Sequence, residues 1–377
     1  MKIVSVVGTR PQLIKAAALL PGLRAHHDDV LVDTGQHWDE RMAGAFFAEL
    51  GLPRPDHALG VGGGGHAAQT GRMLVALEPI LDAESPDAVL VYGDTNSTLA
   101  GALAATKLGI PVAHVEAGLR SFDRRMPEEI NRVVADHLAA WCFAPTTTAV
   151  ANLAREGILD GVVEVGDLMQ DLAARVAVEV RDRAALGVAA DALADAGAPD
   201  LAGMLTPGGF IFATIHRAEN REAAALAAWP PILADAARPD RPVILALHPG
   251  TRAALHDSAI VLPPGVIVVE PLGYRTSLTL QLHAAAVLTD SGGVQREAAW
   301  LGTPCLVLRV TTEWVEAVAE SRGRIVVVGL DRALAARELA RIAPARTSEA
   351  LARARAETLD LRPVGAARRI VDALGPT

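Results

Sequence analysis

The segment AVLVYGDTNS, residues 88–97, shows the pattern that decides the fold: a run of apolar residues that stops abruptly at a carboxylate. The run in PVAHVEAGLR, residues 111–120, stops in the same way at Glu116. Short apolar runs of this kind are typical of buried parallel strands, whose carboxyl ends meet at one edge of a sheet where α/β proteins bind ligands. We therefore expect Asp94 and Glu116 to face a common crevice.

A third acid follows in PEEINR, residues 127–132. Pro127 predicts a helix start, and Arg132 lies one turn after Glu128 on the same helix face. Several carboxylates and a guanidinium aimed at one crevice are what proton transfer on an anionic substrate requires. The sequence thus predicts an enzyme, with Glu128 among its candidate acids.

Apolar runs alternate with Ala- and Leu-rich helical segments along the chain, which predicts parallel sheets with helices on both faces. A stretch rich in Ala, Gly, Pro and Asp, Leu186–Gly209, separates two series of such runs, and we interpret it as a surface loop or a frayed helix. The expected strands are Ile3–Val7, Val30–Asp33, Ala88–Tyr92, Pro111–Val115, Cys142–Ala144, Val162–Val165, Phe210–Thr214, Val243–Leu247, Val266–Val269, Ala286–Thr289, Cys305–Leu308 and Ile325–Val328.

The length indicates two domains, because 377 residues exceed what one hydrophobic core usually supports. The fold class that follows is α/β, with two Rossmann-like, doubly wound domains facing a central cleft. We place the first domain at residues 1–168 and the second at 169–365. A C-terminal helix at about 366–377 is expected to cross back onto the first domain.

The composition argues against several classes of protein. A formal net charge of −9 without a basic run to offset it argues against nucleic-acid and membrane binding. Apolar residues make up 51% of the chain, yet no apolar run reaches the length of a membrane span.

Cys142 and Cys305 lie in apolar runs without metal-ligand spacing, so we expect buried, reduced thiols and no metal site. Since Met1 leads straight into a strand without a signal peptide, we expect a cytoplasmic protein.

Cationic residues follow two of the expected strands. In GTRPQ, residues 8–12, a glycine turn leads to a helix N-terminus that can hold a phosphate, with Arg10 and Lys15 adding positive charge. His216 and Arg217 follow the first strand of the second domain, where such residues are more often functional than structural.

The segment TDSGGVQRE, residues 289–297, is a more specific signal. Its small residues Ser291, Gly292 and Gly293 allow backbone N–H groups to approach an anion, and the dipole of the following helix favours a diphosphate there. Glu297, about one turn into that helix, is placed to accept hydrogen bonds from ribose hydroxyls. A plain tight turn is the alternative.

Taken in order, these motifs resemble those of the non-hydrolysing UDP-N-acetylglucosamine 2-epimerases, from about Ile3 to Val328. The resemblance implies two Rossmann-like halves of the GT-B type, as in one class of glycosyltransferases, a homodimer, and no need for a cofactor, whether NAD, flavin or metal. The motifs that carry it are Gly8-Thr9-Arg10-Pro11, Thr34-Gly35-Gln36-His37, Gly93-Asp94-Thr95, His114-Val115-Glu116-Ala117-Gly118-Leu119-Arg120, Pro127-Glu128-Glu129 with Asn131-Arg132, His216-Arg217 and Asp290-Ser291-Gly292-Gly293.

The resemblance also implies roles for individual residues. The catalytic residues are then Asp94, Glu116, Glu128 and His216. The residues that bind the substrate are Arg10, Lys15, Arg132, Ser291, Gly292, Gly293 and Glu297. Tyr274 and the backbone near Leu272 are expected to contact the base, since Ser277 stands where many relatives place an aromatic residue. The implied substrate is a UDP-N-acetylhexosamine, with UDP-GlcNAc and UDP-ManNAc interconverted through a 2-acetamidoglucal.

The chain departs from the family pattern at several places. Gln12 replaces an acid, Asp167 replaces an asparagine, and Trp314 replaces an arginine that is expected to contact the nucleotide. Ala68 replaces the arginine of a second UDP-GlcNAc site through which bacterial relatives are often activated. Two stretches, Gly93–Gly101 and Arg120–Asp123, also resemble a sub-branch that acts on UDP-2,3-diacetamido-uronic acids.

Three other functions remain open on the sequence. A hydrolase would carry out the same elimination but release the free sugar. A glycosyltransferase shares the two-domain design and the Ser-Gly-Gly turn but does not need three carboxylates in its first domain. A nucleotide-sugar sensor without catalysis is disfavoured by the complete set of acids.

Overall fold

The computed structural model describes residues 1–36, 40–182, 184–195, 198, 201, 204–312, 314–342 and 364–375. His37 and Glu313, which belong to motifs discussed above, lie outside these ranges. The chain divides into two compact units: Met1–Leu172 together with Pro363–Thr377, and Ala173–Arg362.

The first unit is built on a seven-stranded parallel sheet with the order β3-β2-β1-β4-β5-β6-β7. Its strands are β1 (Lys2–Val7), β2 (Asp28–Asp33), β3 (His57–Ala58), β4 (Ala88–Tyr92), β5 (Val112–Val115), β6 (Trp141–Ala144) and β7 (Val162–Glu164). Its helices are α1 (Arg10–Arg24), α2 (Glu40–Glu49), α3 (His66–Glu84), α4 (Asn96–Lys107), α5 (Pro127–Leu138), α6 (Thr147–Arg155) and α16 (Ala366–Leu374). Helix α7 (Leu168–Glu179) begins in this unit and ends in the second.

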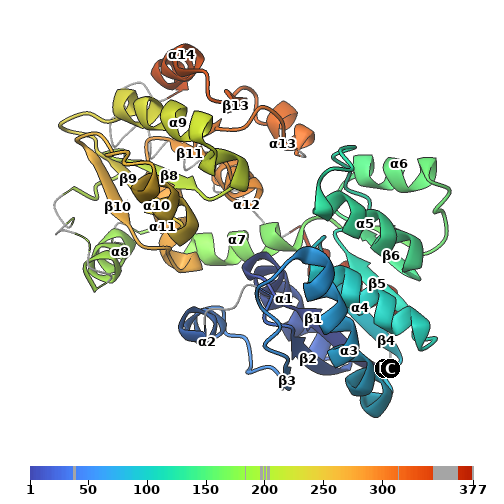
Figure 1. Ribbon diagram of the computed structural model, residues 1–377. Helices are drawn as coiled ribbons and strands as arrows, with labels where there is room; N and C mark the ends of the chain where they lie inside the picture. Colours follow the sequence, from blue (N-terminus) through green and yellow to red (C-terminus); the bar gives the residue numbers. More distant parts are fainter. Residues whose placement is uncertain are drawn as a thin grey trace. The chain divides into compact units, whose positions relative to one another are not determined.

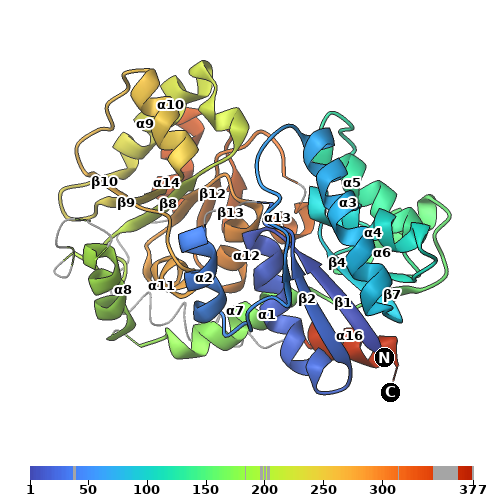
Figure 2. The ribbon, with the colours of Figure 1, turned by 60° about the horizontal axis from the view of Figure 1, so that its bottom comes forward.

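Helices cover both faces of this sheet, as the buried apolar strands require. α3, α4 and α5 are neighbours on one face (Figure 1). There Met73 and Leu77 of α3 belong to one buried cluster with Val6 and Val91 of the sheet. α1 covers the other face, and α16 lies beside it (Figure 2). The start of α16 is fixed by Asp171, whose carboxylate accepts the backbone N–H of Gly365 at 3.0 Å.

The second unit repeats the design with a six-stranded parallel sheet in the order β10-β9-β8-β11-β12-β13. Its strands are β8 (Ile211–Ile215), β9 (Val243–Leu247), β10 (Val266–Val269), β11 (Val287–Thr289), β12 (Cys305–Val307) and β13 (Ile325–Val327). Its helices are α8 (Ala184–Asp195), the 3₁₀ helix η1 (Ala218–Arg221), α9 (Ala223–Ala236), α10 (Pro249–Asp257), α11 (Tyr274–His283), α12 (Gly292–Trp300), α13 (Val315–Glu320) and α14 (Arg332–Ile342).

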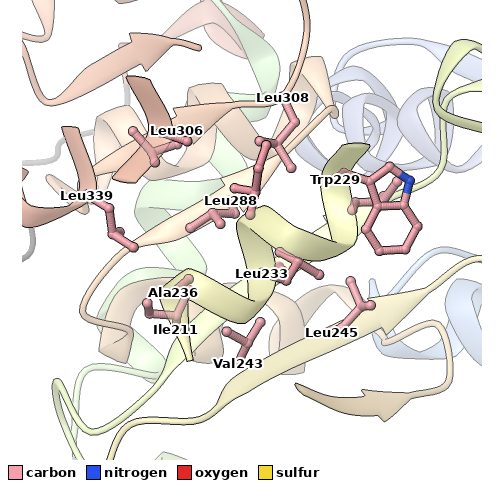
Figure 3. Close-up of a cluster of buried hydrophobic side chains, with 14 of the residues drawn as sticks. Ile211, Trp229, Leu233, Ala236, Val243, Leu245, Leu288, Leu306, Leu308 and Leu339 are labelled. Carbon is pink, nitrogen blue, oxygen red and sulfur yellow. The ribbon is translucent and has the colours of Figure 1, made fainter. Parts of the chain in front are cut away.

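One face of the second sheet packs on α9 and α14 around a core of aliphatic side chains and one indole (Figure 3). Trp229 of α9 is fully buried there, and its ring N–H donates to the carbonyl of Asn220 at 3.2 Å. Leu339 of α14 faces the same core. The bond from Trp229 fixes the position of η1, which directly follows the turn that carries His216.

The structure contains a strand at each place where the sequence predicts one, with ends that agree to within two residues. It also contains β3, which is only two residues long and too short to be detected as an apolar run. The interpretation of Leu186–Gly209 as a loop or frayed helix is wrong for its first part. There α8 is a regular helix, because Leu186 and Leu193 are buried against the second sheet.

Both sheets have a topological switch point, where neighbouring strands lead to connections on opposite sides. It lies between β1 and β4 in the first sheet and between β8 and β11 in the second. Ligands of open α/β sheets bind outside the carboxyl ends of the strands at such points. The candidate residues after β1, β4, β8 and β11 therefore stand where this fold class binds its ligands.

No helix in the described part of the chain is long and apolar enough to cross a membrane.

Candidate active site

The candidate residues of the first unit begin at the turn after β1. Gly8 lies where an added Cβ atom would overlap the hydroxyl oxygens of Thr34 and Ser97. These two hydroxyls are hydrogen-bonded to each other at 2.8 Å. The glycine therefore lets the start of α1 approach the turns that follow β2 and β4.

We expect Gly8→Ala to lower the free energy of unfolding by about 1–3 kcal/mol, since the methyl group must displace two buried hydroxyls. Gly44→Ala on α2 is the matched control, because a Cβ there meets nothing within 4 Å. In a helix this change should be neutral or stabilise by about 0.5–1 kcal/mol. Urea unfolding of both variants checks the expectation, and equal stabilities would contradict it.

Gln12, which replaces the family's acid, links this turn to the one that carries Asp94. Its side-chain oxygen accepts the backbone N–H of Thr9 at 3.1 Å, as in a capping box. Its amide donates to the carbonyl of Tyr92 at 2.7 Å and to the hydroxyl of Thr95 at 2.9 Å. An uncharged donor at this position thus has a structural role in this chain.

Glu116 is held by an ion pair and by its backbone. Its carboxylate pairs with the ammonium of Lys15, and only 11% and 6% of the two side chains are exposed. Its φ angle of 73° lies in the left-handed region, and its N–H donates to the carbonyl of Phe143 at 3.0 Å. Such backbone strain in a non-glycine residue costs on the order of 1–3 kcal/mol and persists where surrounding contacts impose it, often at functional sites.

Asp94 follows β4 and is paired with Arg132 of α5, while its carbonyl accepts the amide N–H of Asn131 at 3.0 Å. Burial raises the pKa of the Asp94 carboxyl, although Arg132 opposes this shift. Glu116 and Glu128 are close enough to raise the pKa further by charge repulsion. Glu128 is half-buried at the second position of α5. The first unit thus places three acids and two cations around one point.

A buried network that the sequence analysis missed supports this arrangement. His114 bonds through Nδ1 to Asp136 and through Nε2 to the carbonyl of Gly93, both at 2.7 Å. Asp136 also pairs with Arg120 at 2.7 Å and accepts the N–H of Gly118 at 3.1 Å. Although burial alone would raise it, the pKa of Asp136 is lowered by the interactions with His114 and Arg120. The network fixes the turns after β4 and β5, which carry Asp94 and Glu116.

The candidate residues of the second unit are organised by Asp290, which was recognised only as part of a motif. The fully buried Asp290 accepts the Nδ1–H of His216 at 3.0 Å and the backbone N–H groups of His216 and Arg217 at 3.0 Å. It also accepts the amide of Asn220 at 2.9 Å. Burial would raise the pKa of Asp290, but the bonds from His216 and Asn220 hold it below its usual range. With Nδ1 bound to Asp290, His216 presents Nε2 for chemistry, and its side chain is 40% exposed.

The Ser-Gly-Gly turn follows β11 and begins α12. The Ser291 hydroxyl accepts the N–H of Val294 at 3.4 Å and so caps the helix. The N–H of Ser291 donates to the hydroxyl of Thr289 at 3.0 Å, which is hydrogen-bonded to Thr214 of β8 at 2.6 Å. These bonds join the turn to the strand that leads to His216. The N-terminus of α12, with Gly292 and Gly293 as its first residues, is of the type that binds phosphate.

The three remaining candidate residues of the second unit are largely enclosed. Glu297 is 4% exposed, and its carboxylate accepts the amide of Gln281 at 2.6 Å. The Tyr274 ring at the start of α11 is also 4% exposed, so it offers little surface for stacking on a base. Leu272 is half-buried and packs against the core between the sheet and α8. Base contacts from this region would therefore come from its backbone.

Two guanidinium groups stack on aromatic rings. Arg10, the first residue of α1, lies 4.5 Å from the ring centroid of Phe46. Arg296 of α12 lies 3.6 Å from the ring centroid of Trp314. In the described part of the chain, no group of three or more His, Cys, Asp or Glu side chains could hold a metal ion.

Comparison with known proteins agrees with the fold and with the motifs. The family model of UDP-N-acetylglucosamine 2-epimerase matches residues 23–375. A Pseudomonas aeruginosa protein, UDP-2,3-diacetamido-2,3-dideoxy-D-glucuronate 2-epimerase, is 44% identical over 338 residues, 88% of this chain and 89% of its own. The crystal structure of Methanocaldococcus jannaschii UDP-GlcNAc 2-epimerase in complex with UDP-GlcNAc and UDP has a TM-score of 0.83 and 35% identity, covering 99% of each chain.

The glycosyltransferase SnogD from Streptomyces nogalater shares the fold alone, with a TM-score of 0.56, 19% identity and coverage of 99% and 98% of the two chains. The protein is therefore an α/β protein of the GT-B type, built from two Rossmann-like units. With the family model matched over most of its length, the chain belongs to the UDP-N-acetylglucosamine 2-epimerase family.

Proposed function

We propose that the protein is a non-hydrolysing 2-epimerase, an isomerase that interconverts UDP-GlcNAc and UDP-ManNAc. Its family membership supports an epimerase. The observation that carries the proposal is the setting of Asp94, whose carboxyl is within electrostatic reach of Glu116, Glu128, Lys15 and Arg132 in one unit. A buried acid whose pKa is shifted by neighbouring charges is typical of sites that transfer protons.

The chemistry of C2 inversion explains why such a group of acids is needed. The C2 proton of a sugar is barely acidic, so removing it alone would create an unstable carbanion. Removing it while UDP leaves C1 gives a glycal instead. Protonation of C2 on the opposite face, with return of UDP to C1, completes the inversion. This sequence requires a base, an acid, negative charge near an oxocarbenium-like C1 and a group that retains UDP.

We assign Asp94 and Glu128 to proton exchange at C2, because they belong to the same group of acids and differ in environment. Asp94 is paired with Arg132, whereas Glu128 stands at the N-terminus of α5. Glu116, held by Lys15, supplies negative charge near C1 or positions the sugar.

The second unit would retain the nucleotide. We assign binding of the diphosphate to the Ser291–Gly293 turn at the start of α12. His216 would assist the leaving diphosphate, with Asp290 compensating the positive charge that forms when the imidazole carries two protons. The first unit would then act on the sugar, and the second would bind UDP.

A second candidate substrate is a UDP-2,3-diacetamido-uronic acid, because a relative with 44% identity is named for that activity. The Arg120–Asp123 stretch does not provide a free cation for the extra carboxylate. Arg120 is buried and paired with Asp136 and Glu156, both at 2.7 Å.

We further propose a homodimeric, cytoplasmic enzyme that needs no cofactor, on the strength of the family resemblance.

Proton NMR of UDP-GlcNAc with the protein in heavy water tests the function. We expect deuterium to enter C2 and UDP-ManNAc to appear, with net release of UDP below a few per cent of turnover. The same experiment with the diacetamido-uronic acid distinguishes the two candidate substrates.

Other outcomes would contradict the proposal. Stoichiometric release of UDP and free sugar would indicate a hydrolase. Consumption of the UDP-sugar only with an acceptor would indicate a glycosyltransferase. Binding without C2 exchange in either substrate would indicate a sensor.

A further inference from the structure

Glu129 directly follows the proposed catalytic acid Glu128, yet it faces a different set of partners. Its carboxylate accepts the backbone N–H of Ser121, the hydroxyl of Ser121 and the backbone N–H of Phe122, each at 2.9 Å. It also pairs with Nη1 of Arg132 at 3.1 Å. With 3% of its side chain exposed, Glu129 is a buried carboxylate with four polar contacts.

Arg132 joins Glu129 to the candidate catalytic centre. Its Nη1 contacts Glu129, whereas its Nη2 contacts Asp94. One guanidinium is thus divided between two carboxylates, so neither receives the whole of its charge. The charged groups that face Asp94 are Arg132 of α5, Glu128 of α5, Lys15 of α1 and Glu116 after β5. Glu129 sets how much of the positive charge of Arg132 acts on Asp94.

Glu129 also holds a turn in an unusual conformation. Phe122 has a φ angle of 59°, in the left-handed region that β-carbon sterics disfavour, and its side chain is 74% exposed. Two of the bonds to Glu129 come from backbone N–H groups of this turn. The same carboxylate therefore stabilises the strained turn and orients the guanidinium beside Asp94.

We propose that Glu129 is a positioning residue of the epimerase, which shares the guanidinium of Arg132 with Asp94 and ties that ion pair to the Ser121–Phe122 turn. The inference rests on the proposed function, because it assigns Asp94 to proton transfer. Glu129 acts through Arg132 and is not itself placed at the reacting atoms. Its charge keeps the Arg132–Asp94 pair from becoming so strong that the carboxyl is locked in its ionised form.

The test is Glu129→Gln, which removes the charge and keeps the size of the side chain. Arg132 should then act on Asp94 alone, and one nearby negative charge is lost. Both changes lower the pKa of Asp94. We expect kcat to fall about tenfold, KM to change less than about threefold, and the limb of the kcat/KM pH profile that belongs to Asp94 to move to lower pH.

Ser121→Ala is the matched control. It removes one hydrogen bond to Glu129 and loosens the same turn without changing any charge. If Glu129 only held the turn, the two variants would show the same pH profile. We expect the Ser121→Ala profile to coincide with that of the wild type.

Titration of the Asp94 carboxyl by ¹³C NMR separates this inference from the proposed function. The signal of Asp94 is assigned as the one that disappears in Asp94→Asn. An unchanged titration in folded Glu129→Gln would overturn the inference even if C2 exchange is found. A lower pKa would support it even if no UDP-sugar is turned over. If Glu129→Gln does not fold, Arg132→Lys replaces it. A single ammonium cannot contact both carboxylates as the guanidinium does, so the pKa of Asp94 should change, and an unchanged value would overturn the inference.

Discussion

Asp94→Asn is expected to lower kcat for C2 epimerisation about a thousandfold or more while the protein stays folded. The carboxyl is one of two groups assigned to proton exchange at C2, and an amide can neither accept nor supply that proton. In this variant a hydrogen bond from Arg132 to the side-chain oxygen of the asparagine replaces the ion pair, so the position of Arg132 should be kept. Deuterium incorporation at C2 of UDP-GlcNAc measures the loss directly.

Stability should behave differently from activity in this variant. Because burial raises the pKa of Asp94, folding favours its protonated form. Stability from this group is complete below the pKa of the unfolded chain and is lost as pH rises through the raised value. A neutral Asn avoids that loss, so the melting temperature at neutral pH should not fall.

Asp82→Asn, on the exposed side of α3, is the matched control and should leave both kcat and melting temperature unchanged. Near-normal turnover in folded Asp94→Asn would refute the role assigned to Asp94.

The strand ends could be predicted from the sequence because the pattern is local. A buried parallel strand needs a continuous apolar run, and a carboxylate cannot extend that run into the core without a partner. Asp94 and Glu116 therefore mark the ends of β4 and β5 directly. The start of α5 at Pro127 was predictable for the same reason, since proline is suited to the first turn of a helix.

The supporting residues could not be predicted in this way, because their roles depend on contacts far apart in the chain. Asp136 lies near the end of α5, where an acid is normally solvated. It is buried because His114 and Arg120, from another segment, compensate its charge. Nothing in the local sequence distinguishes it from a surface acid.

The error at α8 has a related cause. The composition of Leu186–Gly209 indicates a weak helix, since isolated helices of this length are marginal in water. Burial of Leu186 and Leu193 against the second sheet supplies the stabilisation that propensity lacks. Tertiary packing thus overrides the local signal, as it also does for the two-residue strand β3.

Asp290→Asn should have the second large effect, on both stability and turnover. The two oxygens of Asp290 accept only donors: two backbone N–H groups, the amide of Asn220 and the Nδ1–H of His216. An asparagine at this position turns its own NH₂ group toward some of these donors, so a buried donor is left without an acceptor. We expect the free energy of unfolding to fall by about 2–4 kcal/mol and kcat to fall about a hundredfold, because His216 loses the anion that orients it.

The pH dependence of unfolding makes the origin of this loss visible. The pKa of Asp290 is depressed in the folded protein, so its contribution to stability is present above the unfolded value of about 4 and is lost as pH falls through the depressed one. The difference in stability between wild type and Asp290→Asn should therefore be constant at neutral pH and shrink in acid. Asp235→Asn is the matched control in the same unit, since Asp235 forms an exposed ion pair with Arg332 at 2.6 Å and should cost less than about 1 kcal/mol. If the two variants unfold at the same urea concentration and turn over UDP-GlcNAc equally fast, Asp290 does not organise the turn that carries His216.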